Sequence, residues 1–170
     1  MAKFLRIVIE AILLSILYGI AHDMVTAHVW VEYFTVHHAK VVESTNPVVM
    51  ALVWGVLATW WMGAFAGGLL WAFSTLGTFP ALPLLRLRQI MLRGMGGLYV
   101  TAMLVLGLSY IGLGWIGQGH DIPDLEVRRR AMSVGITHMY SYGAGALLIL
   151  AMGARVLYLR SRAATALRSP

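Results

Sequence analysis

The longest stretch of this chain without a charged side chain lies between Glu43 and Arg86, and it limits the possible folds more than any other feature. A helix needs roughly 20 apolar residues to cross the hydrocarbon of a bilayer, and this stretch meets that length. Of all 170 residues, 59% are hydrophobic and 12% are charged, whereas a typical soluble domain carries about 25% charged residues. Because such a chain cannot form an ordinary water-facing surface, the sequence predicts an integral membrane protein.

Four apolar segments, separated by short connections, divide the chain. No connection is long enough to hold a folded soluble domain, and helix-breaking prolines lie at the junctions: Pro47, Pro80, Pro83 and Pro123. The sequence therefore predicts one all-α, polytopic transmembrane domain over residues 1–170, with four helices packed as a bundle. The predicted spans are approximately 4–34, 48–79, 94–117 and 131–158.

Lysine and arginine residues are distributed unevenly about these spans, which predicts the orientation of the chain. If the N-terminus is cytoplasmic, nine of them lie on the cytoplasmic side: Lys3, Arg6, Arg86, Arg88, Arg93, Arg155, Arg160, Arg162 and Arg168. Four lie on the outer side: Lys40, Arg128, Arg129 and Arg130. Because cytoplasmic loops carry the excess of basic residues, both termini are predicted to be cytoplasmic.

The excess of basic over acidic residues gives the chain a net charge of +6. In a soluble protein this balance would suggest a nucleic-acid partner. Here the basic residues flank apolar runs, so the predicted partner is the lipid bilayer and no nucleic acid is expected. The first apolar segment also has features of a cleaved signal peptide ending at 25–27, but the acidic Glu10 in its N-terminal region disfavours cleavage.

The chain has no cysteine, which excludes disulfides, thiolate metal sites, iron–sulfur clusters and cysteine nucleophiles. A metal would therefore be held by imidazole and carboxylate groups. In the predicted orientation all the histidines lie toward the outer side: His22, His28, His37, His38, His120 and His138. Most of the acids share that side: Asp23, Glu32, Glu43, Asp121, Asp124 and Glu126.

Four of these residues follow one another closely near the outer end of the first segment. His28 and Glu32 are four residues apart, so they share one face of a helix. Asp23 precedes Glu32 by nine residues and lies roughly 180° away at about 100° per residue. One straight helix therefore cannot direct all four side chains to one point, and His22 or Asp23 would join through another helix or a break in this one. His138, in the outer half of the fourth segment, is the candidate from another helix.

Imidazole and carboxylate ligands suit zinc, copper(II) or non-haem iron. The sequence therefore predicts a divalent-metal site formed by His22, Asp23, His28, Glu32 and His138. It contains neither an HExxH motif nor the paired ExxH motifs of di-iron bundles. Two alternatives stay open for these residues, a hydrogen-bonded polar cluster without a ligand and a b-type haem held by two histidines on facing helices. A catalytic metal would activate water or a redox ligand, but nothing in the sequence identifies a substrate or decides whether the protein is an enzyme.

Stripes of small residues predict close contacts between helices. Gly63 and Gly67 form a GxxxG motif, and the fourth segment carries small residues at the same spacing: Ser133, Thr137, Ser141 and Gly145. These stripes and the small size of the chain also favour a non-catalytic subunit of a larger membrane complex, with partner subunits or further copies of itself. A transporter of four helices would have to oligomerise. Near the cytoplasmic side, Glu10 is predicted to form an ion pair with Arg6, four residues before it, whose loss costs little stability.

The first helix contains the run His22-Asp23-Met24-Val25-Thr26, followed by Glu32-Tyr33-Phe34. This pattern resembles the HD-x-VT…EYF signature of an uncharacterised family of small bacterial integral membrane proteins, in which a glutamine is expected at the position of Met24. The Trp60-Trp61 pair and the segment from His138 to Tyr142 are similar as well. The resemblance implies a four-helix protein of the bacterial inner membrane. It carries no established activity, so it transfers no catalytic residue.

Overall fold

The computed structural model describes residues 1–116 and 124–167, with side chains described outside 113–123 and 168–170. The described residues form helices and no strands: α1 (Ala2–Val29), α2 (Glu32–Thr35), α3 (Pro47–Leu57), α4 (Trp60–Thr75), α5 (Leu84–Ile116) and α6 (Leu125–Ala166). Within that part of the chain, 4 units are long and apolar enough to cross a membrane: Ala2–Val29, Pro47–Thr75, Leu84–Gly112 and Leu125–Ala166. The prediction of an all-α fold with four spans is confirmed.

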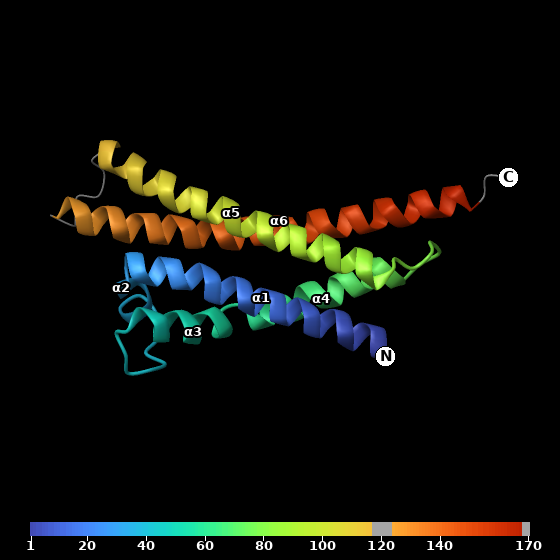
Figure 1. The fold of residues 1–170 in the computed structure, drawn as a ribbon, viewed down its shortest axis with the longest axis horizontal. Helices are drawn as coiled ribbons and strands as arrows, with labels where there is room; N and C mark the ends of the chain where they lie inside the picture. Colours follow the sequence, from blue (N-terminus) through green and yellow to red (C-terminus); the bar gives the residue numbers. More distant parts are fainter. Residues whose placement is uncertain (117–123, 168–170) are drawn as a thin grey trace.

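The helices form two packed groups that lie side by side (Figure 1). In one group α1 packs against α3 and α4, and in the other α5 packs along α6. Contacts of α4 with α6 and of α1 with α5 join the groups. Both termini lie at the same end of the bundle, and α2 and α3 lie toward the opposite end (Figure 1).

Glycines allow α1 to lie against α3 and α4 at short distance. A Cβ atom added at Gly63 would lie 2.7 Å from Cα of Ile12, and one added at Gly67 would lie 2.8 Å from Cα of Val8. No larger residue fits at either position without moving the backbone of α1. The predicted GxxxG motif is therefore a packing surface, and its partner is α1.

The second predicted span, 48–79, is interrupted in its middle. Helix α3 ends at Leu57 and α4 begins at Trp60, without a proline or glycine between them. The hydroxyl of Thr59 donates to the carbonyl of Gly55 four residues earlier, a side-chain bond that competes with the helical ladder and bends helices. The side chains of Trp60 and Trp61, directly after the break, are 48% and 50% exposed, so they lie on the outside of the bundle.

Two helices are longer than the predicted spans. Helix α5 begins at Leu84, directly after Pro83, where the sequence predicted a connection up to residue 93. Helix α6 begins after Asp124, whose carboxylate accepts from the backbone N–H of Glu126 and Val127, and it continues to Ala166. The spans were predicted from apolar composition, but a helix can continue into the polar interface because its backbone hydrogen bonds are internal.

The end of the bundle that carries the termini is held by a buried arginine. The side chain of Arg160, on α6, is 1% exposed. All three nitrogens of its guanidinium donate to backbone carbonyls that end α4 and begin the following loop: Phe73, Leu76, Phe79 and Pro80. These carbonyls have no further helical turn to bond them, so the guanidinium replaces the missing donors. We call this group the Arg160 clamp.

A second charged group at this end joins α1 to α5. Glu10 accepts from Nε of Arg6 at 3.2 Å, as the spacing predicted. It also accepts two hydrogen bonds from Arg88 on α5, from Nε at 3.1 Å and from Nη2. The sequence did not indicate Arg88, because the pairing of α1 with α5 is a property of the packed fold.

Candidate metal centre

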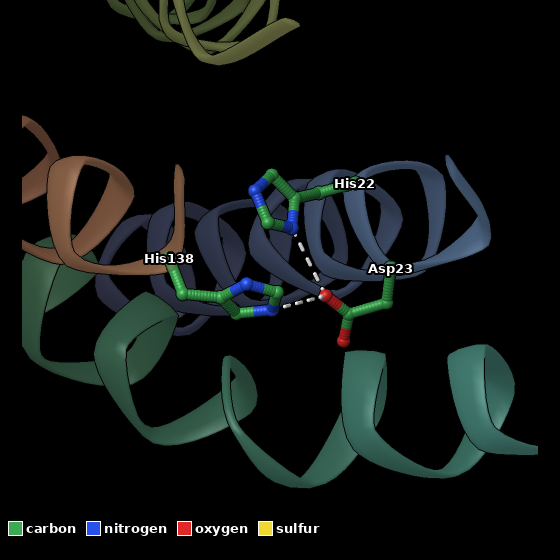
Figure 2. A group of neighbouring side chains, drawn as sticks. All are labelled: His22, Asp23 and His138. Atoms are coloured by element: carbon green, nitrogen blue, oxygen red, sulfur yellow. Dashed lines mark hydrogen bonds and ion pairs between the residues drawn. The ribbon is translucent and has the colours of Figure 1, made fainter. Parts of the chain in front are cut away.

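Three buried side chains from two helices converge in the half of the bundle away from the termini. His22 and Asp23 lie on α1 and His138 lies on α6, with exposed fractions of 3%, 5% and 6% (Figure 2). Oδ1 of Asp23 lies 3.0 Å from Nδ1 of His22 and 3.3 Å from Nε2 of His138. Each residue offers one ligand atom, and these atoms lie within 4.8 Å of one another. The three residues could therefore hold a metal ion.

The hydrogen bonds of His138 assign its tautomer. Its Nδ1 lies 2.9 Å from the carbonyl oxygen of Val134. A carbonyl can only accept, so Nδ1 carries the proton and the neutral ring has a free lone pair on Nε2. This Nε2 is buried and makes no hydrogen bond to any described residue. It faces the carboxylate of Asp23 (Figure 2), another group that only accepts when ionised, and a cation between the two would satisfy both.

The ring of His22 is held from its other side. Its Nε2 lies 3.1 Å from Oγ of Ser141 on α6, and the hydroxyl of Tyr18 donates to that oxygen at 2.9 Å. A chain of hydrogen bonds thus runs from Tyr18 through Ser141 and His22 to Asp23. Such outer partners orient imidazole ligands in metal sites. The sequence placed Ser141 one turn from His138 but did not indicate Tyr18, although its position four residues before His22 puts it on the same face of α1.

Aromatic residues of α2 cover the centre on the side away from the termini. The ring of Tyr33 lies 4.1 Å from the ring of His138, and the ring of Phe34 lies 5.6 Å from it. The side chain of Tyr33 is a phenol, which is neutral at physiological pH. The centre is therefore enclosed by neutral rings, and charges on Asp23 or a bound ion would act with little screening.

Two of the five predicted ligands lie outside this centre. Helix α1 ends at Val29, Trp30 is extended (φ −156°, ψ 96°), and Glu32 begins the separate helix α2. The prediction that His28 and Glu32 share one helical face is therefore wrong, because the helix does not continue between them. Both side chains are exposed, and Nδ1 of His28 bonds the carbonyl of Met24. His138 of α6, the predicted ligand from another helix, lies beside Asp23 and not beside His28 and Glu32.

His38 lines the same cavity as the three-residue centre but is not one of the grouped residues that could hold the ion. His37 is exposed, and Nδ1 of His38 lies 2.8 Å from the carbonyl oxygen of Tyr33. His120 and Asp121 lie outside the described residues. The rings of His22 and His138 meet edge to face with their centroids 4.7 Å apart. A porphyrin plane cannot lie between rings at that separation, so the geometry disfavours a haem held by this pair.

No protein-family model, no curated protein and no solved structure matches this chain. The chemistry of the three buried side chains is therefore the basis for a function.

Proposed function

We propose that this protein is a multi-pass membrane protein that binds one divalent metal ion through His22, Asp23 and His138. The observation that carries the proposal is Nε2 of His138, which is buried, lies 3.3 Å from Oδ1 of Asp23 and has no hydrogen-bond partner among the described residues. An intramembrane carboxylate is costly unless it is compensated. A divalent cation bound to both groups compensates the carboxylate and uses the lone pair.

The spacing of the ligand atoms supports a small metal. Metal–ligand bonds of about 2.0–2.1 Å in a tetrahedral zinc site place neighbouring ligand atoms roughly 3.3 Å apart. The two separations measured from Oδ1 of Asp23 are 3.0 Å and 3.3 Å. Two imidazoles and one carboxylate form the ligand set of many catalytic zinc sites and of non-haem iron sites, both of which keep coordination positions open. Zinc is the first candidate and iron(II) the second.

The location we propose is the bacterial inner membrane, with both termini in the cytoplasm and the metal centre in the outer half of the bilayer. The support is the grouping of basic residues at the end of the bundle that carries the termini. There Lys3 donates to the carbonyl of Leu82, Arg88 bonds Glu10, and Arg160 bonds the end of α4. Basic residues concentrate on the cytoplasmic side of membrane proteins.

A second candidate function is that of a subunit in a larger membrane assembly. Helix α5 presents Gly96, Gly97 and Gly107 on an exposed face where an added Cβ would meet no atom within 4 Å. Glycines on an outer helical face allow a second helix to approach closely. Purification distinguishes the two candidates, because a subunit co-purifies with stoichiometric partners whereas a metalloprotein keeps its metal when isolated alone.

The proposal is tested by elemental analysis of protein purified without a histidine tag, followed by titration of the metal-free protein with Zn²⁺. We expect wild type and His28→Ala to bind the ion and His138→Ala to lose it. His28→Ala is the matched control, since His28 is a histidine of the same half of the bundle but lies outside the centre. Chelation should lower the melting temperature of wild type and leave that of His138→Ala unchanged. Wild type that holds no metal and melts identically in EDTA and Zn²⁺ would overturn the proposal in favour of a hydrogen-bonded cluster.

A further inference from the structure

A cavity of about 110 Å³ lies between the two groups of helices and contains the metal centre at one end. Its polar lining includes the centre and its hydrogen-bonded partners, together with three further polar side chains: Tyr18, His22, Asp23, His138 and Ser141, with Ser15, His38 and Thr59. Further from the centre, its walls are apolar or small and come from α4, α5 and α6, with Met62, Met95, Leu98 and Met152 among them. The metal centre therefore faces a space with one polar end and an apolar body.

The cavity adjoins the face of the bundle that meets lipid. A second hollow on the outside of α4 and α6 shares Met62 and Ile149 with the cavity, so these two side chains separate the two spaces. The outer hollow is lined by Trp61 and Phe65, which are 50% and 60% exposed. Methionine is unbranched and flexible, so a change of rotamer at Met62 would connect the two spaces. A ligand that enters between α4 and α6 comes from the bilayer and must be soluble in lipid.

The chemistry of the polar end selects the head group of such a ligand. Nε2 of His138 and the carboxylate of Asp23 both offer lone pairs to a cation, and a cation held there with an open position takes a further oxygen ligand such as a hydroxyl. The aromatic rings of Phe34, Trp54 and Tyr142 also line the cavity. Aromatic faces and methionine thioethers pack favourably against a flat ring.

We infer that this cavity binds a hydroxyl-bearing aromatic ring with an apolar tail, a phenol or hydroquinone dissolved in the bilayer. Its hydroxyl oxygen takes the coordination position that two imidazoles and one carboxylate leave open on the metal, so the inference rests on the proposed function. The tail leaves between α4 and α6 past Met62 and Ile149. An engineered apolar cavity of about 150 Å³ holds benzene, so the 110 Å³ cavity admits a ring once the side chains of Met62, Met95 and Met152 shift.

The experiment uses Co²⁺ in place of the native ion, because the visible absorption bands of Co²⁺ change when a new oxygen ligand binds. The full chain is loaded with Co²⁺ in phosphatidylcholine nanodiscs and titrated with para-heptylphenol or with its methyl ether, para-heptylanisole. We expect the phenol to shift the bands, and the ether, which has the same ring and tail, to need at least ten-fold higher concentration for any shift.

Two leucine substitutions, two residues apart on α6 and therefore on different faces of the helix, test whether the cavity is the binding space. Gly145 lines the cavity, and a Cβ there meets Leu98 at an ordinary 3.8 Å, so the backbone tolerates a side chain at this position and Gly145→Leu narrows the cavity. Gly143 is exposed and has no atom within 4 Å of an added Cβ, so Gly143→Leu is the matched control. We expect Gly145→Leu to bind Co²⁺ as wild type does but to need at least ten-fold more phenol, and Gly143→Leu to behave as wild type.

The two proposals fail in different ways. Co²⁺ bands that appear but do not respond to the phenol overturn this inference and leave the metal site intact. Equal responses to phenol and ether, or equal affinity of the two leucine variants, also overturn it. Protein that develops no Co²⁺ bands overturns the proposed function, and with it the contact between hydroxyl and metal.

Discussion

The Arg160 clamp and the centre formed by His22, Asp23 and His138 both bury polar side chains inside a membrane bundle, but they satisfy them differently. In the clamp every guanidinium nitrogen donates to a backbone carbonyl. In the centre one ring nitrogen, Nε2 of His138, has no hydrogen bond although it faces a carboxylate. A fully satisfied group contributes to the fold, whereas a group left unsatisfied costs stability and is retained where it binds something.

The charges of the two regions are also compensated by different means. Arg160 carries a permanent positive charge against the carbonyls at the C-terminal end of α4, where the helix dipole is negative. Nothing further is required to stabilise it. Asp23 has two imidazoles as its nearest partners, and their charge depends on a proton or a metal ion. The folded chain alone therefore compensates the charge of Arg160, whereas the charge of Asp23 is compensated only when a proton or a metal ion is bound.

The largest expected effect is the loss of stability in Arg160→Met. The substitution keeps an apolar side chain of similar length but leaves the carbonyls of Phe73, Leu76, Phe79 and Pro80 without their donor. A single buried acceptor left unsatisfied costs about 1–3 kcal/mol, and because Leu76 and Phe79 are themselves exposed, we expect the free energy of unfolding to fall by about 3 kcal/mol for the group as a whole. The measurement is unfolding by SDS titration from mild detergent.

Arg162→Met is the control for this prediction, because Arg162 is exposed and donates to the hydroxyl of Tyr158. We expect it to unfold as wild type does. Arg160→Lys, which keeps the charge but not the planar set of donors, should fall between the two. A stable Arg160→Met variant would show that water can replace the guanidinium at these carbonyls. The clamp would then not be a group that the fold requires, and it would no longer contrast with the metal centre.

The next effect separates metal binding from stability. Asp23→Asn keeps the size of the side chain but removes the charge, so we expect the affinity for Zn²⁺ to fall by more than about 100-fold, since even outer partners of a metal ligand are worth 10–100-fold. In EDTA the same variant should melt within a few degrees of wild type or above it, because a buried carboxylate that lacks its cation is costly. If Asp23→Asn binds Zn²⁺ with the affinity of wild type, Asp23 is excluded as a ligand. If Asp23→Asn is much less stable than wild type in EDTA, Asp23 stabilises the fold as Arg160 does, independently of a metal.

The sequence predicted the four spans and named His22, Asp23 and His138 as members of the candidate site. It did not predict where the helices break or which helices pack together. Composition along the chain is sufficient for the spans, because a bilayer sets both their length and their polarity. The two helix breaks were not predictable from breaker residues, since neither Trp30 nor Thr59 is a proline or glycine. The break at Thr59 depends on a side-chain bond to Gly55, and the break at Trp30 separates His28 from Glu32. Pairs on different helices, such as Glu10 with Arg88, follow from packing that no local pattern contains.

A smaller effect is expected from the hydrogen-bonded chain behind His22. Ser141→Ala removes the group that contacts Nε2 of His22, so the imidazole loses its fixed orientation. We expect a 10–100-fold weaker affinity for Zn²⁺, with little change in melting temperature of the metal-free protein. Ser133→Ala, on the same helix, is the control, because that buried hydroxyl bonds the carbonyl of Arg130 and not the centre. Equal Zn²⁺ affinity in Ser141→Ala and wild type would show that His22 is held by its ring contacts alone.

The smallest effect is expected at Glu10, which is charged and paired but lies at the edge of the bundle. Its side chain is 20% exposed, and those of its partners Arg88 and Arg6 are 40% and 60% exposed, so water screens all three charges. Exposed ion pairs contribute little to stability, and a glutamine can still accept a hydrogen bond from Arg88. We therefore expect Glu10→Gln to lower the melting temperature by a few degrees at most, and the difference to shrink in high salt. A fall as large as that of Arg160→Met would mean that the link between α1 and α5 is shielded from water, and that the end of the bundle carrying the termini depends on two buried charges and not on one.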